Sequence, residues 1–138
     1  DPVVRGELLD LFLEFIQDER HSIIMSSHIT ADLERCADFL TYITHGMLYY
    51  SGPKDEFEDA FRLVKGGPDE LTDGLQRAMV GIRTYATGFD ALVRTQDIPH
   101  IGGTDGLLTQ HASIEDVIRL TNAAEYTAIG NTNKGDVR

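Results

Sequence analysis

The sequence contains a single cysteine, Cys36, so it cannot form an intramolecular disulfide, and this usage is typical of a reducing compartment. Basic residues are also scarce: 12 Lys and Arg stand against 23 Asp and Glu, which gives a formal net charge of -11. This balance disfavours binding to nucleic acid or to anionic lipid head groups, because both need clustered cations. We therefore expect a domain that binds no nucleic acid. In addition, no apolar run approaches the length of a membrane span.

The first residues, Asp1-Pro2, carry no basic and apolar leader and no initiator Met. We therefore expect no signal peptide here, and a processed or trimmed chain. With 138 residues, of which 41% are hydrophobic, the chain can form one domain, or a small domain and part of another.

The sequence shows no recognisable metal site, although it has five histidines. No pair of them has a ligand spacing such as His-x-x-x-His, and Cys36 has no partner cysteine. Solvated or locally bonded side chains are therefore expected. The histidines are His21, His28, His45, His100 and His111.

Two further arrangements could be mistaken for catalytic groups. The acidic patches at 18–19 and 55–59 fall on expected helix exteriors, where a solvated charged face is the better interpretation. Ser26 and Ser27 stand beside His28, but adjacent residues on a strand point to opposite faces, so the sequence alone does not make them a nucleophile and its base.

The first half of the sequence alternates helix and strand patterns. Asp1-Pro2 predicts a helix start with Asp as the N-cap, and apolar residues at helical spacing continue to about Arg20. The segment Ser22–Ser27 has an apolar centre bounded by small polar residues, which predicts a buried strand of a parallel sheet. A short helix follows to Cys36, with Thr30 as its expected cap.

A hairpin comes next, with strands over 39–44 and 47–51 joined by His45-Gly46, and then a short acidic helix over 54–60. After a possible strand over 61–65, Gly66-Gly67-Pro68 breaks the pattern and predicts a domain boundary. The segments expected beyond it are a helix at 68–75, strands at 78–85, 98–101 and 106–110, and an ambiguous stretch at 88–94. Gly81 predicts a bulge, and Ser113 with Asp116 predicts a capping box that opens a helix to about Ala124.

His28 directly follows the predicted buried strand. Open α/β sheets bind ligands beyond the carboxyl ends of their strands, so a titratable side chain at this position can face a ligand. Taken alone, the stretch favours a histidine that only caps a helix or satisfies a carbonyl, since short motifs often match by chance.

The flanking sequence changes that interpretation, because residues 1–64 resemble the C-terminal part of the ATP-binding subunit of an ABC transporter. Asp1-Pro2 is similar to the end of the family's D-loop, and Ser26-Ser27-His28 to its switch-histidine loop. Residues 32–38 resemble the helix that follows this loop, and residues 39–52 the last strands. Four such segments, in this order and at these spacings, make the resemblance fairly specific.

The resemblance implies that His28 is a catalytic residue that contacts the γ-phosphate and the attacking water. It implies that Asp1 acts across a dimer interface, so that Asp1 and His28 are both cofactor-binding. The intact protein would use ATP and Mg, with a membrane permease and a second ATP-binding subunit as partners. The family further implies a bacterial protein in the cytoplasm, peripheral to the membrane through its permease.

Other parts of that nucleotide site are missing from the sequence. No Gly-x-x-x-x-Gly-Lys-Ser/Thr follows a strand, no Leu-Ser-Gly-Gly-Gln signature occurs, and the Walker B carboxylates would lie upstream of residue 1. We therefore expect the C-terminal fragment of a longer ATPase. This fragment should bind no nucleotide tightly and should not hydrolyse ATP alone.

The expected fold is α/β, with three parts. Residues 1–65 would form part of an ABC ATPase core, as a partial, mostly parallel sheet with flanking helices. Residues 66–128 would form a small α/β accessory domain, and residues 129–138 a disordered tail. Through 88–93 and 112–117, the accessory domain is similar to an extension found in some bacterial exporter-type ATPases.

Two alternatives from other classes stay open. One is a stand-alone regulatory module whose second half binds a ligand. The other is an interaction domain that exposes strand edges and the Leu8, Phe12 and Phe15 face. In the second case the isolated chain would form a homo-oligomer, or exchange elements between copies.

Overall fold

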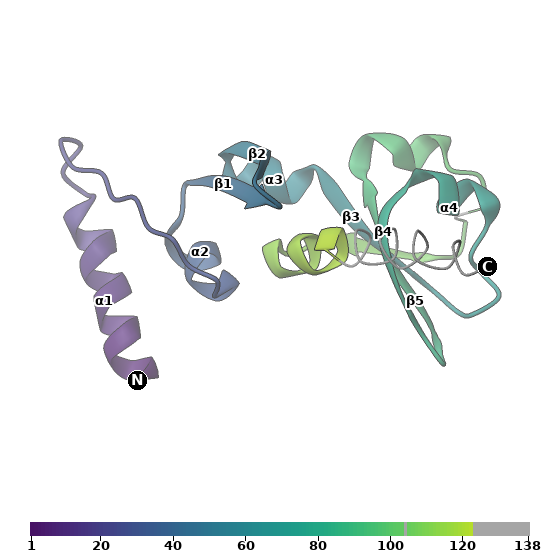
Figure 1. Cartoon of the computed structure of the whole chain (residues 1–138), viewed down its shortest axis with the longest axis horizontal. Helices are drawn as coiled ribbons and strands as arrows, with labels where there is room; N and C mark the ends of the chain where they lie inside the picture. The colour runs from purple at the N-terminus through teal and green to yellow at the C-terminus, as the bar shows by residue number, and fades with distance from the viewer. Residues whose placement is uncertain (104, 123–138) are drawn as a thin grey trace, which may run out of the picture. The chain divides into compact units, whose positions relative to one another are not determined.

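The computed structural model describes residues 1–103 and 105–122, and over this range the protein is mixed α/β (Figure 1). The chain divides into two compact units, Asp1–Lys54 and Asp55–Arg138. This division falls earlier than Gly66-Gly67-Pro68, where the sequence predicts a boundary. The reason is that β3 (Phe61–Gly66) pairs with strands of the second unit. The predicted tail at 129–138 lies outside the described residues.

The helices of the first unit follow from local capping. In α1 (Pro2–Phe15), Asp1 Oδ1 accepts a hydrogen bond from Val3 N at 2.9 Å, and Pro2 takes the first helical position. The predicted start is confirmed, but the helix ends before Arg20. Helix α2 (Thr30–Cys36) has Ile29 at its N-cap position and no side-chain cap, so the expected cap by Thr30 is wrong.

Residues Ser22–Ser27, predicted as a buried strand, form an extended loop instead. Ile24 at the centre of this loop is 100% exposed. None of the described strands pairs with the segment. The prediction is therefore wrong in this structure, because a strand needs a neighbour to satisfy its backbone N–H and C=O groups, and apolar composition does not supply one.

The first unit also contains the predicted hairpin, made of β1 (Phe39–Thr44) and β2 (Met47–Pro53). His45 and Gly46 adopt positive φ angles of 51° and 72°, the conformation of a type I′ turn, whose twist matches that of the two strands. At the far end of the hairpin, Lys54 Nζ donates a hydrogen bond of 2.8 Å to the Glu34 carbonyl and so ties the hairpin to α2.

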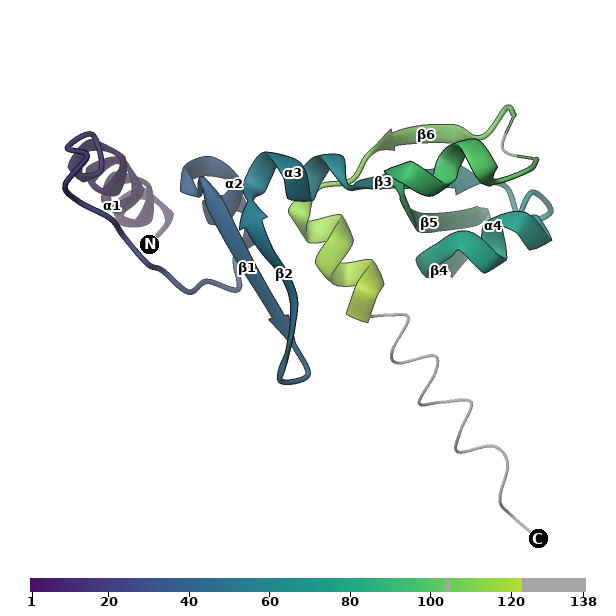
Figure 2. The same cartoon turned by 90° about the horizontal axis from the view of Figure 1, so that it is seen from above.

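The second unit is built on a four-stranded sheet of order β4-β5-β3-β6, which Figure 2 shows from β4 at the bottom to β6 at the top. Its other strands are β4 (Met79–Tyr85), β5 (Gly88–Arg94) and β6 (Leu108–His111). All strand pairs in both units are antiparallel over the described residues, so the prediction of a mostly parallel sheet is wrong. Parallel pairing needs a long crossover connection, whereas short turns join β1 to β2 and β4 to β5.

The helices around this sheet agree only in part with those predicted from the sequence. Helix α3 (Lys54–Asp59) precedes β3 as predicted, and residues 114–122 are helical as far as they are described. Helix α4 (Asp73–Ala78) begins later than the expected 68–75, because Thr72 Oγ1 caps it by accepting from Leu75 N at 3.2 Å. The weak strand expected at 98–101 is instead part of a 3₁₀ helix, η1 (Thr95–His100).

The alternation of side chains along β3 and β5 gives the sheet two buried faces. On one face, Val64 and Val93 pack with Leu75 of α4 and with Ile101. On the other face lie Leu63 and Leu92, which are cross-strand partners, and Leu92 is in turn opposite Gly81. The helix at 114–122 covers this second face, on the opposite side of the sheet from α4 (Figure 1).

Two local sequence predictions in the second unit are confirmed. The register of β4 against β5 shifts between Met79 and Gly81, which is the predicted bulge. Ser113 Oγ accepts from Asp116 N at 3.0 Å, and Asp116 Oδ2 accepts from Ser113 N at 3.1 Å, so the capping box closes in both directions.

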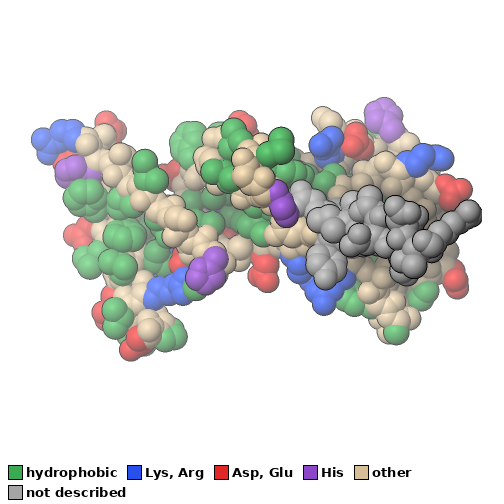
Figure 3. Space-filling view, in the orientation of Figure 1, with side chains coloured by type: hydrophobic (Ala, Val, Ile, Leu, Met, Phe, Trp, Pro, Cys, Tyr) green, Lys and Arg blue, Asp and Glu red, His purple; other side chains and the backbone are tan. Residues whose placement is uncertain are grey.

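Helix α1 is apolar on two sides. Leu9 is buried, whereas a second stripe at helical spacing faces solvent. Hydrophobic side chains are visible along this helix and over the hairpin (Figure 3). The exposed stripe consists of Val4, Leu8, Leu11 and Phe15, and the exposed apolar residues of the hairpin are Phe39, Ile43, Met47 and Leu48.

Replacing Gly81 with alanine should destabilise the second unit. An added Cβ would lie 2.1 Å from the Leu120 carbonyl oxygen, so the helix at 114–122 would have to move away from β4. We expect a loss of about 1–3 kcal/mol in the free energy of unfolding, measured by urea denaturation. Gly102→Ala is the control, because nothing lies within 4 Å of its added Cβ. Equal unfolding midpoints for the two variants would contradict the packing described here.

The exposed apolar stripe of α1 should make the isolated chain self-associate. Light scattering across a wide concentration range should give a mass that rises with concentration, and Leu11→Glu should shift this rise to higher concentration. Glu14→Gln, on the same helix, should not weaken the association. A monomer at every concentration would count against the expectation.

Candidate functional site

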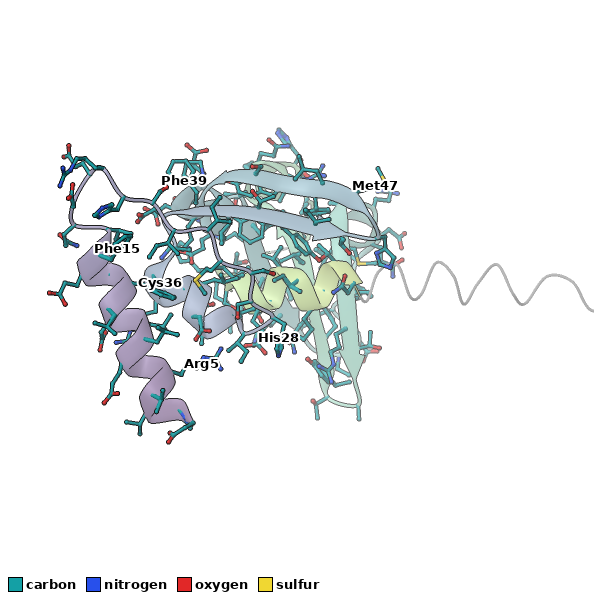
Figure 4. The ribbon with its side chains drawn as sticks, turned by 60° about the vertical axis from the view of Figure 1, so that its left-hand side comes forward. Arg5, Phe15, His28, Cys36, Phe39 and Met47 are labelled. Atoms are coloured by element: carbon teal, nitrogen blue, oxygen red, sulfur yellow. The ribbon has the colours of Figure 1, made fainter. Side chains whose placement is uncertain are left out.

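A salt bridge between Arg5 and Asp32 joins the starts of the two helices of the first unit. Arg5, in the first turn of α1, donates from Nε to both carboxylate oxygens of Asp32 at 3.0 Å, and its Nη2 also contacts Oδ2. The Asp32 side chain is only 11% exposed and that of Arg5 38%. Arg5 projects from α1 toward α2, and His28 lies in the loop that leads into α2 (Figure 4).

The loop before α2 is closed by Ser27. Its Oγ accepts a hydrogen bond from Ile29 N at 3.0 Å, so the hydroxyl bridges across His28. The same Oγ lies 3.4 Å from Asp32 Oδ2 and 3.4 Å from the Ile29 carbonyl oxygen. The conformation around His28 is therefore set by its two neighbours and by a carboxylate of α2.

The structure places the two predicted site residues at different helix ends. His28 is exposed and makes no hydrogen bond or ion pair with any described residue, so its imidazole is available to a ligand. Asp1 uses its carboxylate to cap α1. No hydrogen bond joins Asp1 to His28, although both precede helices that Arg5 and Asp32 hold together. Their roles toward nucleotide stay predictions.

Hydrogen bonds from Arg5 hold the pKa of Asp32 below its ordinary value, and the Arg5 charge and Ser27 act in the same direction against the effect of burial. The Cys36 thiol shows the opposite behaviour. Burial raises its pKa, and the negative charge of Asp32 adds to this effect. Cys36 Sγ donates to the Asp32 carbonyl oxygen at 2.9 Å and lies 3.8 Å from Met25 Sδ, so it is a packed thiol and not an activated nucleophile.

Sequence reasoning missed the roles of Arg5, Ser27 and Asp32. A signal was present, because Arg5 precedes the buried Leu9 by one helical turn and so occupies the inward side of α1. A cation on the inward side of a helix needs an anion nearby. The pattern could not say which carboxylate supplies it, because the two residues are distant in the sequence.

Two of the other histidines have local contacts. His21 stacks on Phe15, with ring centroids 4.1 Å apart, and His45 Nδ1 lies 3.0 Å from Thr44 Oγ1 in the hairpin turn. Within the described residues, no three His, Cys, Asp or Glu side chains gather in a way that could hold a metal ion. Among the same residues, no helix combines the length and the apolar character needed to cross a bilayer.

An open hollow of about 390 Å³ lies in the second unit, lined by Ala60, Phe61, Arg94, Thr95 and Gln96. Its size falls within the range of small-molecule sites. Thr95 Oγ1 already donates a hydrogen bond of 2.6 Å to the Asp59 carbonyl oxygen. The other polar side chains that line the hollow are those of Arg94 and Gln96. A ligand-binding role for the second half stays a prediction.

The stabilising effect of the Arg5–Asp32 pair should depend on pH. Because the folded-state pKa of Asp32 is lowered, its contribution is complete above the unfolded-state value of about 3.9 and disappears as the pH falls through the lower folded-state value. We expect Asp32→Asn to reduce the urea midpoint of the first unit at pH 7, and this difference from the original chain to shrink below pH 4. A difference that stays constant with pH would contradict the ionic origin of the effect.

Comparison with known proteins gives two matches, each over part of the chain. One protein of Mycoplasma pneumoniae, provisionally named an ABC transporter ATP-binding protein, is 30% identical over 90 residues, which cover 62% of this chain and 27% of that protein. The thiamine import ATP-binding protein ThiQ of a Chelativorans species is 34% identical over 56 residues, which cover 41% of this chain and 23% of ThiQ.

The chain thus spans about a quarter of the length of the curated relatives it matches. No protein-family model matches the sequence. No solved structure matches it with significance. The two partial matches support a relationship between this chain and the ATP-binding proteins of ABC transporters.

Proposed function

We propose that this chain is part of the ATP-binding subunit of an ABC transporter and that His28 is the switch histidine of that subunit. The observation that carries the proposal is the setting of His28. Its side chain is exposed and makes no hydrogen bond to a described residue, while Ser27 and Ile29 on either side of it are bonded to each other. The partial relationship to ABC transporter ATP-binding proteins supports the same assignment.

This arrangement suits phosphoryl transfer to water, which depends on positioning and charge stabilisation more than on covalent chemistry. A neutral imidazole can accept a hydrogen bond from an attacking water, and a protonated one can donate to a phosphate oxygen. In the proposed site His28 makes one of these two hydrogen bonds next to the γ-phosphate of ATP bound with Mg. Asp1, as the end of the D-loop and the N-cap of α1, acts across the contact with a second ATP-binding subunit.

The remaining parts of the proposal concern the intact protein. ATP hydrolysis would drive transport through a membrane permease, with the ATP-binding subunit peripheral to the cytoplasmic face of the membrane. The sequence of this chain lacks a P-loop and a signature motif, so the chain alone would not turn over ATP.

His28→Ala, made in the longer ATPase that contains this chain, should reduce kcat by roughly 100-fold or more with a smaller effect on KM, because the group acts mainly in the transition state. Steady-state phosphate release with Mg and ATP measures both constants. His111→Ala is the control, since His111 is an exposed residue of the second unit, and its kcat should be unchanged.

Two outcomes would contradict the proposal. Full activity of the His28→Ala protein would show that His28 takes no part in ATP hydrolysis. Magnesium-dependent turnover by the isolated 138-residue chain, lost on His28→Ala, would show that the chain is an ATPase on its own.

A further inference from the structure

We propose that Arg5, Asp32 and Ser27 form a positioning relay that fixes the loop of His28 relative to the start of α1. The inference rests on the proposed function, because it gives the relay a purpose: to hold the switch histidine in a defined place with respect to the D-loop end at Asp1. None of the three residues would touch the nucleotide. They are positioning residues that act through His28.

The first step of the relay is the Arg5–Asp32 pair. The guanidinium donates to both carboxylate oxygens, which fixes the orientation of the carboxylate as well as its position. Arg5 is one helical turn beyond Asp1, whose carbonyl accepts from Arg5 N at 3.1 Å. A displacement of the start of α1 is therefore transmitted to Asp32.

The second step runs from Asp32 to the loop. The carboxylate of Asp32 lies 3.4 Å from Ser27 Oγ, and this oxygen accepts from Ile29 N at 3.0 Å. This hydrogen bond from Ile29 N to Ser27 Oγ spans His28 and restricts its backbone conformation. The 3.4 Å contact between Ser27 Oγ and Asp32 is the longest in the relay. Loss of the Asp32 charge should therefore break this contact before the others.

The chain contains a second ion pair between the same two helices, Arg35 of α2 with Asp10 of α1. The Arg35 and Asp10 side chains are 46% and 63% exposed, and neither contacts Ser27. The Arg35 charge is only the last of the causes that lower the pKa of Asp32. If Asp32 only tethers α1 to α2, then loss of the Asp10 pair should have the same kind of effect on the loop. If Asp32 positions His28, then only loss of Asp32 should reach the histidine.

The test is NMR spectroscopy of the 138-residue chain, which reads the His28 imidazole signals and the exchange rate of the Ile29 amide. Ser27→Ala removes the acceptor, so the Ile29 amide should exchange roughly two- to tenfold faster, and the His28 signals should shift. Asp32→Asn should also shift the His28 signals. Asp10→Asn and Ser26→Ala are the controls, and both should leave these signals in place.

Ser27→Ala keeps the test decisive if Asp32→Asn fails to fold, because it leaves the ion pair intact. Unchanged His28 and Ile29 signals in Ser27→Ala would overturn the relay, as would equal shifts in Asp10→Asn and Asp32→Asn.

Kinetics of the longer ATPase separate this inference from the proposed function. Lower kcat at constant KM in Ser27→Ala, with His28→Ala inactive, supports both. Normal kcat in Ser27→Ala with His28→Ala inactive overturns the relay alone. Normal kcat in His28→Ala overturns the proposed function, while the NMR result still decides whether the relay holds the loop.

Discussion

A carboxylate that is almost removed from water determines the arrangement of the first unit. Asp32 is stabilised as an anion at that position because the Arg5 guanidinium reaches it from another helix and donates to both of its carboxylate oxygens. The pair thereby fixes which turn of α1 lies against α2. The loop with His28, the packed thiol of Cys36 and the carbonyl that it bonds are all placed by α2, so they depend on the same ionic contact.

Short-range rules predicted the local features of this chain well. The Asp1 cap, the His45-Gly46 turn and the Ser113–Asp116 capping box each depend on residues within four positions of one another, and a sequence displays such neighbours directly. Apart from the β1–β2 hairpin, the pairing of strands was not predicted. The apolar run at Ser22–Ser27 has the composition of a buried strand, but the pairing of a strand depends on which neighbour is available, and its sequence carries no record of that neighbour.

The candidate site shows the same division. His28 was identified because a histidine after an apolar run, within a series of segments that resemble one family, can be recognised from the sequence alone. Arg5 and Asp32 were missed because their meaning comes from a contact between two helices that are separated by a loop. In the sequence, Asp32 is one charged residue of the segment 32–38 that follows His28, and nothing local marks its role. Only its low exposure distinguishes it from the solvated carboxylates around it.

Gly88 has a different kind of consequence. A side chain there would collide with the carbonyl oxygen of Gly66, only 2.1 Å from the position of its Cβ, so two backbones approach each other where β5 begins beside the end of β3. Selection on such a position acts through the fold and not through any ligand. If this glycine proves invariant among relatives of the second unit, its conservation will record a steric requirement of the sheet, and it should not be taken as a mark of a binding surface.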